Sequence, residues 1–201
     1  MSTAASRRDE YSQSTRRALL DAGLELFVSS GYTSVSAEQV VRTAGLTRGA
    51  LYHHFDGGKR GLFEAVFEEQ EAAASQKISD AIGSRTEVWE RQLAAVDAFL
   101  DVCSEKNYRE IVLLQGPAAL GWERWRELDE QYLRGLVLDS ISTLRTSGLI
   151  ESHPDTLATA AIYGAITEVS LAVAHAPDPA LAREQAAHLI RDLFSGIRTR
   201  Y

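Results

Sequence analysis

Residues 36–54 carry the pattern that most restricts how this chain can fold. Ser36 stands where a helix N-cap is expected, and Gln39, three residues later, completes a capping box. Gly45 then interrupts the helical spacing, and Thr47 stands as the cap of a second short helix. Two short helices joined by a tight turn that contains glycine form a helix-turn-helix, so the sequence predicts this motif here.

Helical spacing dominates the rest of the chain, and glycine or proline stands at most of the breaks. Proline occurs 4 times among 201 residues, and Ala and Leu are abundant, which favours helix. We expect an all-α fold of about nine helices, in which a three-helix N-terminal unit follows a short disordered arm and precedes longer helices. The expected helices cover residues 12–29, 37–43, 48–54, 59–82, 86–104, 108–115, 122–147, 155–175 and 179–199.

Charge is distributed unevenly along the chain. The formal net charge of −7 argues, taken alone, against nucleic acid as a partner. However, residues 1–60 contain eight Lys or Arg and six Asp or Glu, whereas residues 61–201 contain 13 basic and 22 acidic residues. A basic unit can approach phosphate groups while an acidic unit is repelled by them. We therefore expect an N-terminal arm with a helix-turn-helix DNA-binding domain at 1–60 and a larger helical domain at 61–201.

Cysteine use and hydropathy indicate the compartment. Cys103 is the one cysteine in the sequence, so no intrachain disulfide can form, and a reducing compartment is favoured. We expect Cys103 to serve in packing rather than as a redox sensor, because nothing in the sequence lowers its pKa. The N-terminus lacks the apolar stretch of a signal peptide, and no run of about 18 apolar residues is evident. These features predict a cytoplasmic protein without membrane-spanning segments.

The sequence around the predicted motif is recognisable. It reads VVRTAGLTRGALYHHF at residues 40–55, after AGLELF at 22–27 and GYTSVS at 31–36. Over about residues 15–67 the chain resembles the TetR/AcrR transcriptional regulators, and its later helices agree with that family in number and length. The resemblance implies a homodimer that binds double-stranded operator DNA as a repressor and is released by a small-molecule effector. The alternatives are an activator or a ligand-independent regulator of the same fold.

Several residue types on the second helix of the motif suit contacts with DNA. Arg48 can read guanine with two hydrogen bonds, Tyr52 can reach phosphate oxygens, and Gly49 permits close approach because it lacks a side chain. The family has two residues between the positions of Phe55 and Lys59, whereas this chain has three. The resemblance implies DNA contacts from Thr33, Ser36, Thr47, Arg48, Gly49, Tyr52, His53 and Lys59.

Residues 113–125 combine a Gly-Pro break with two tryptophans three positions apart, which share a helix face. Ligand pockets are mostly apolar and aromatic, with a few polar groups that orient the ligand. The alternative is that both tryptophans are core or interface anchors. The residues expected to line a pocket are Phe99, Leu114, Trp122, Trp125, Tyr132 and Tyr163, and those expected to orient a ligand are Gln115, Glu168 and His175.

The predicted helix at 155–175 is rich in small residues, which let helices approach closely. The family resemblance places the last two helices in a four-helix interface between two copies; the alternative is that this helix is central in its own core. The charge division and the resemblance together suggest how a ligand could act. A ligand in the acidic domain would favour one arrangement of the helix at 59–82. It would thereby change the spacing between the two reading helices of a dimer, which are the second helices of the two helix-turn-helix motifs.

Other functional classes lack support in the sequence. No Gly-x-Ser-x-Gly motif, metal-ligand cluster, or paired nucleophile and base is present, so we expect neither an enzyme nor a bound cofactor. His53 and His54 point about 100° apart on a helix and have no partner at ligand spacing, so no metal site is expected. The glycines before Lys59 lack the spacing of a phosphate-binding loop and follow no strand.

Overall fold

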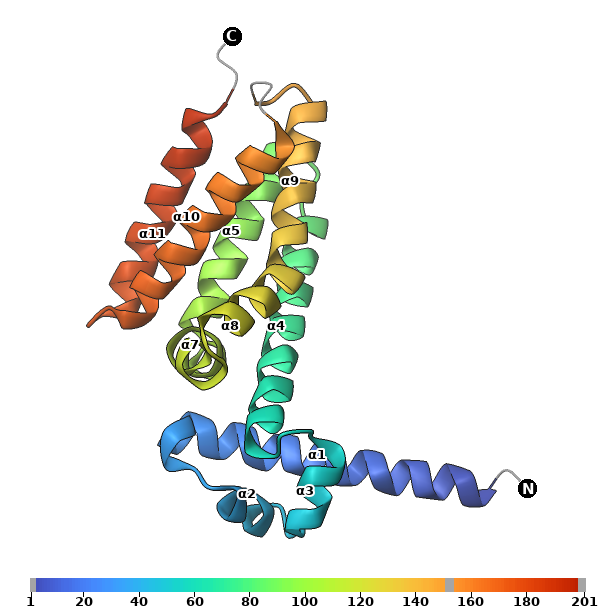
Figure 1. The fold of residues 1–201 in the computed structure, drawn as a ribbon. Coiled ribbons are helices and arrows are strands. Elements are labelled where there is room, and N and C mark those ends of the chain that lie inside the picture. Colours follow the sequence, from blue (N-terminus) through green and yellow to red (C-terminus); the bar gives the residue numbers. More distant parts are fainter. Residues whose placement is uncertain (1–2, 151–153, 199–201) are drawn as a thin grey trace.

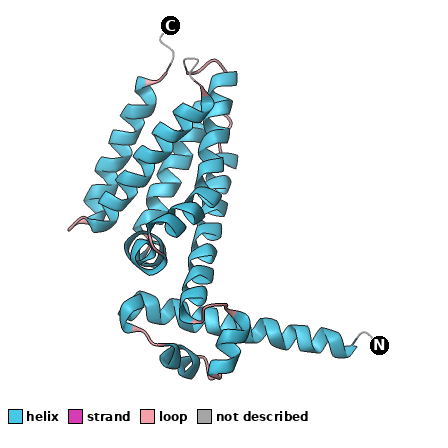
Figure 2. Cartoon of the chain, in the orientation of Figure 1, coloured by secondary structure: helices cyan, strands magenta, loops and turns pink. Residues whose placement is uncertain are grey.

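The computed structural model describes residues 3–150 and 154–198, and helices dominate it (Figure 1). Apart from one antiparallel bridge between Ile150 and Arg198, no β structure occurs in these two ranges (Figure 2). Besides a short 3-10 turn, helical segments there form nine unbroken stretches, which confirms the predicted fold class. The elements are α1 (Thr3–Ser30), η1 (Tyr32–Ser34), α2 (Ala37–Thr43), α3 (Arg48–His54), α4 (Lys59–Gly83), α5 (Val88–Ser104), α6 (Lys106–Tyr108), η2 (Arg109–Gln115), α7 (Gly116–Leu120), α8 (Trp122–Asp129), η3 (Glu130–Arg134), α9 (Gly135–Thr146), α10 (Asp155–His175) and α11 (Pro179–Gly196).

The two ends of the chain differ from the prediction. α1 begins at Thr3, so the described part of the expected disordered arm is helical. The reason is local, because no glycine or proline stands before Gly23 to interrupt a helix. α11 ends at Gly196. Residues 1–2 of the expected arm and residue 199 of the last predicted helix lie outside the described ranges.

Two segments that were predicted as ordinary α-helix contain π-helical turns, η2 and η3. Such turns are rare and often lie at functional positions. The predicted helix break at Gly116 and Pro117 is wrong. Pro117 lies in the first turn of α7, where its missing N–H is not needed. The chain turns instead at Gly121, whose φ of 84° lies in the region that favours glycine.

Helix α4 joins two groups of helices. Figure 1 shows α1, α2 and α3 at one end of the molecule and the later helices gathered along α4. We call residues 3–55 the head and residues 88–198 the body. The 25 residues of α4 begin beside α1 and end against α5. Buried apolar side chains form one cluster from the head through α4 into the body, so α4 connects the two mechanically.

The side chain of Gln115 links the body directly to the head. Its Nε2 donates to the carbonyl oxygen of Phe27 at 3.0 Å, and its Oε1 accepts from the backbone N–H of Tyr32 at 2.8 Å. Phe27 lies near the end of α1, and Tyr32 begins η1. One amide at the end of η2 therefore fixes the turn between α1 and η1 against the body.

Replacing Gln115 with leucine is expected to destabilise the protein by about 1–3 kcal/mol, because the Tyr32 N–H loses its acceptor at a half-buried position. Chemical unfolding measures the loss, and amide hydrogen exchange should show faster exchange at Tyr32. Gln131→Leu on η3, where the side chain is exposed, serves as the matched control. Unchanged exchange at Tyr32 in the Gln115 variant would contradict the link.

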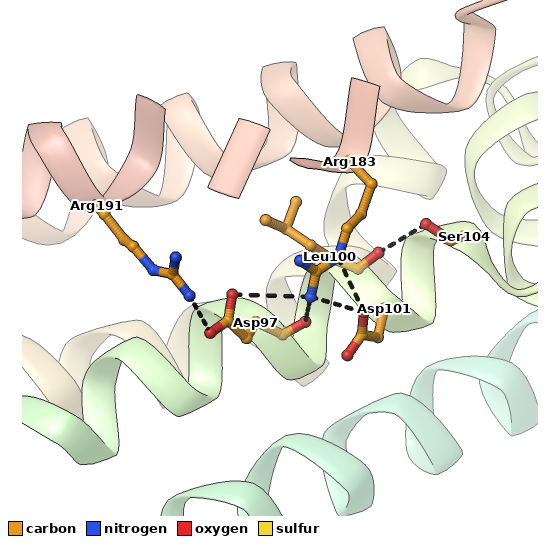
Figure 3. Close-up of polar contacts among 6 residues, drawn as sticks. All are labelled: Asp97, Leu100, Asp101, Ser104, Arg183 and Arg191. Carbon is orange, nitrogen blue, oxygen red and sulfur yellow. Dashed lines mark hydrogen bonds and ion pairs between the residues drawn. The ribbon is translucent and has the colours of Figure 1, made fainter. Parts of the chain in front are cut away.

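Ion pairs attach α11 to α5 (Figure 3). Arg183 Nε donates to Asp101 Oδ1 at 2.9 Å, and Arg183 Nη2 donates to the carbonyl oxygen of Asp97 at 3.2 Å. Arg191 pairs with the carboxylate of Asp97 on the same side. The side of α11 that faces α5 is thereby occupied within the single chain.

Two acidic side chains are buried, Glu71 on α4 and Asp129 on α8. Glu71 and Asp129 are 0% and 3% exposed. Glu71 accepts a hydrogen bond from the Tyr108 hydroxyl at 3.4 Å, and Asp129 accepts one from the Tyr163 hydroxyl. Burial, and then the charge of Asp129, raise the pKa of Glu71 well above its usual range. Burial raises the pKa of Asp129 to about 6. This pair therefore opposes folding when both groups are ionised.

Replacing Glu71 with glutamine is expected to stabilise the protein near neutral pH. Because the folded-state pKa is raised, the folded protein holds a proton that the unfolded chain releases, so wild-type stability falls as pH rises above the ordinary carboxyl pKa. The melting temperature of E71Q should exceed that of wild type at about pH 8 and match it at about pH 4, with each kcal/mol worth roughly 2–4 °C. Glu68→Gln, one turn earlier, is the control. A gain that is equal at both pH values would contradict burial of the charge as the cause.

Among the described residues, the 21-residue α10 is the one helix that is long and apolar enough to cross a membrane, by length and composition alone. In the structure it packs against α5, α9 and α11. A core helix of a soluble protein has the same composition, so the finding does not define a membrane segment.

Candidate nucleic-acid interface and internal cavity

The helix-turn-helix forms through the local contacts that the sequence predicts. Ser36 Oγ accepts from the N–H of Gln39 at 3.2 Å, and Gln39 Oε1 accepts from the N–H of Ser36 at 2.7 Å, which confirms the capping box. Thr47 Oγ1 accepts from the N–H of Ala50 at 3.2 Å and caps α3. Gly45 adopts φ 67° in the turn. These contacts explain why the two helices begin and end where they do.

Apolar side chains hold the motif together and leave one side of α3 open. Val40 and Leu51 are fully buried between the helices. The five positions predicted to face DNA from α3 and its cap are all exposed, and so are two predicted phosphate contacts on the preceding turn and cap. These exposed residues are Thr33, Ser36, Thr47, Arg48, Gly49, Tyr52 and His53. The structure thus gathers them at the end of the molecule farthest from the C-terminus (Figure 1).

Arg48 is the arginine among these exposed residues. Its guanidinium pairs with Glu38 of α2 at 2.7 Å and lies 5.6 Å from the ring centre of Tyr52. An exposed pair of this kind contributes only about 0–1 kcal/mol. The guanidinium can therefore exchange Glu38 for a base or a phosphate at little cost.

Lys59, which was expected to contact DNA, has two backbone partners within the head. Its Nζ donates to the carbonyl oxygens of Tyr32 and Val35 at 2.9 and 2.8 Å and lies 4.1 Å from the ring centre of Tyr32. Two of its three N–H donors thus bind the turn that carries Thr33, so Lys59 positions the predicted phosphate contacts. The extra residue before Lys59 is accommodated by Gly57 and Gly58, with φ values of 74° and 62°.

A cavity of about 60 Å³ lies between the body and the end of α4. Side chains from α4, η3, α5, α9, α10 and α11 line it, and most of them are aliphatic or aromatic. Ile78 and Ile82, near the end of α4, contribute to the lining. The helix that begins beside the head therefore ends on the wall of this cavity.

The structure brings only part of the predicted ligand set to this cavity. Phe99 and Tyr163 line it. Trp125 lies fully buried in the core and donates its Nε1–H to the carbonyl oxygen of Val112 at 2.8 Å, whereas Trp122 is 51% exposed. Seven predicted residues lie outside the lining, namely Leu114, Gln115, Trp122, Trp125, Tyr132, Glu168 and His175.

Sequence reasoning missed Gln92 as a lining residue. It lies on α5 with Val96 and Phe99, at a spacing that places the three on one helix face, and all three line the cavity. A polar residue in register with an apolar stripe was the available signal, because such a side chain points toward the core.

Comparison with known proteins agrees with this geometry. The exposed second helix of a helix-turn-helix, joined to an all-helical body, is typical of DNA-binding transcriptional regulators. Residues 19–66 match the family model of bacterial regulatory proteins of the tetR family, and residues 89–197 match the tetracyclin repressor-like C-terminal domain. The protein belongs to the TetR family of transcriptional regulators and carries its helix-turn-helix DNA-binding domain.

Individual relatives show the same pattern. The chain is 35% identical to the HTH-type transcriptional regulator SrpR of Pseudomonas putida over 107 residues, which cover 52% of this chain and 48% of SrpR. It is 35% identical over 105 residues to the HTH-type transcriptional regulator TtgW of Pseudomonas putida, and the match covers 51% of this chain and 75% of TtgW. The match thus spans about half the length of SrpR. A solved TetR-family regulator from Pectobacterium atrosepticum has a TM-score of 0.81 at 28% identity and covers 95% of this chain and 97% of that one.

Proposed function

We propose that this protein is a ligand-responsive repressor, which binds a palindromic operator as a homodimer and is released by a small molecule. The observation that carries the proposal is the course of α4. Its first turns hold Leu62 and Phe63 against the head, and its last turns place Ile78 and Ile82 on the cavity wall. The 25 residues span roughly 37 Å at 1.5 Å per residue.

The size of the cavity suggests how a ligand would act. Its volume of about 60 Å³ is well below the 150 Å³ or so of a cavity that admits benzene. Ordinary ligands therefore have to separate the lining helices, including the end of α4. Because α4 carries the head, the two reading helices of a dimer change their separation. Ligand and DNA then compete through their different affinities for the two arrangements.

The outer faces of α10 and α11 suit a second copy of the chain. Four leucines on these helices are exposed, and exposed small residues on α10 permit close helix packing. The opposite side of α11 is already held by α5 (Figure 3). Two-fold pairing through these faces would present two reading helices to half-sites roughly 34–36 Å apart. The exposed leucines are Leu157, Leu181, Leu189 and Leu193.

Residues 1–60 then form the DNA-binding domain, and residues 61–201 form the ligand-binding and dimerisation domain. The DNA contacts of residues 1–60 come from the exposed residues on α3, on its cap and on the turn that precedes α2. Lys59 holds that turn in place.

Selection from random duplex DNA tests the proposal. Purified protein at a fixed salt concentration should enrich one palindrome, because a two-fold dimer reads two inverted half-sites. The salt must be stated, since phosphate contacts make affinity depend on it. Sedimentation should show a dimer, and Leu189→Glu should shift it toward monomer. Enrichment of a single half-site, or of no sequence by a folded dimer, would contradict the proposal.

A further inference from the structure

The chemistry of the cavity wall restricts what can bind in the cavity. None of the described residues that line it is Asp, Glu, Lys, Arg or His. Burial of an ion without a partner is strongly unfavourable, so a charged group has no counterpart there. The polar groups on the wall come from Gln92, Ser140, Tyr163 and Thr167.

Gln92 differs from its neighbours on this wall. Tyr163 already donates to Asp129, and it also hydrogen-bonds with Thr167. Gln92 is 5% exposed, and its Oε1 has no hydrogen-bond partner. Among the described residues, four buried side-chain polar atoms lack a hydrogen-bond partner, and Gln92 is the one residue of the four that lines the cavity. A buried carbonyl oxygen without a donor is costly, so a ligand that supplies a donor gains affinity there.

We propose that the effector is a neutral, mostly apolar small molecule with one hydrogen-bond donor, such as a phenol or an alcohol, which donates to Gln92 Oε1. This inference rests on the proposed ligand-responsive function and adds the chemical class of the ligand. The apolar part lies against Phe99, Ile78 and Ile82, and the donor faces α5.

Three probes of one shape test this class: para-cresol, para-methylanisole and para-toluate. They share a ring and a methyl group, and they differ in having a donor, no donor, or a negative charge. Titration of ¹⁵N-labelled protein follows the side-chain amide signals of Gln92, which are assigned by their loss in Q92L, and the backbone amide signals of the lining residues Ala95 and Ile166, which remain in every variant. We expect para-cresol to bind about fivefold more tightly than para-methylanisole. We expect para-toluate not to bind in the cavity, because its charge has no partner there.

Two variants separate the hydrogen bond from general packing. In Gln92→Leu the preference for para-cresol should disappear. Thr159→Val is the matched control, because Thr159 Oγ1 is also buried without a partner but lies outside the cavity lining. Both variants should melt at or above the wild-type temperature, since each removes an unpaired buried polar atom. T159V should keep the wild-type preference.

Equal affinity for para-cresol and para-methylanisole, binding of para-toluate in the cavity, binding by none of the probes, or an unchanged preference in Q92L would each overturn the ligand class. Operator release is measured in parallel with the same probes. If para-cresol binds as expected but leaves operator affinity unchanged, the ligand class stands and ligand-driven release fails. If para-methylanisole and para-cresol release the operator equally well, the ligand class fails and the proposed repressor mechanism stands.

Discussion

Replacing Arg48 with alanine is expected to lower the affinity for the selected operator about 100-fold. Arg48 is exposed on α3, and its pair with Glu38 is too weak to retain it. A guanidinium that forms two hydrogen bonds to guanine discriminates by about 1–3 kcal/mol, and a dimer loses two copies at once. Fluorescence anisotropy with labelled operator at fixed salt measures the loss, and a mutated operator measures the loss of specificity.

Two further variants test the cause of that loss. Arg85→Ala removes an exposed arginine from the segment between α4 and α5 and should leave affinity unchanged. Glu38→Gln should strengthen binding severalfold, because it removes both the competitor for Arg48 and a negative charge beside the DNA. Wild-type affinity in R48A, or equal losses in R48A and R85A, would show that α3 does not read the operator through this side chain.

The helix-turn-helix could be predicted from sequence because its determinants are local. The caps formed by Ser36 and Thr47 involve partners three residues away. The role of Gln115 could not be predicted, because the two backbone groups to which its side chain hydrogen-bonds lie 83 or more residues earlier in the chain. Its polar side chain near a Gly-Pro pair suggested a ligand contact, whereas it lies between head and body.

The cavity shows a second limit of sequence patterns. Phe99 and Tyr163 were recognisable as large side chains on apolar faces, and both reach the wall. The tryptophan pair suggested a pocket equally well. The positions of the two tryptophan side chains depend on tertiary packing, because Trp125 fills the core beside Gly116 and Trp122 remains exposed. Composition alone does not distinguish a side chain that fills the core from one that lines a cavity.

Replacing Gly61 with alanine is expected to destabilise the protein by about 3 kcal/mol or more and to lower the melting temperature by roughly 10 °C. Gly61 lies in the first turn of α4, where an added Cβ would lie 1.9 Å from the carbonyl oxygen of Asp56. That neighbour is backbone, so rotation of a side chain cannot relieve the contact. The turn must move instead, and it contains Gly57 and Gly58, which already adopt positive φ.

The consequences of that movement extend to the head. Lys59 leaves the carbonyl oxygens that it binds at Tyr32 and Val35, so operator binding should weaken together with stability. Gly83→Ala is the matched control on the same helix, because a Cβ there meets nothing within 4 Å. It should be neutral or stabilise by up to about 1 kcal/mol, since alanine favours helix. If calorimetry places both variants within about 2 °C of wild type, the close approach of Asp56 to α4 does not limit this position.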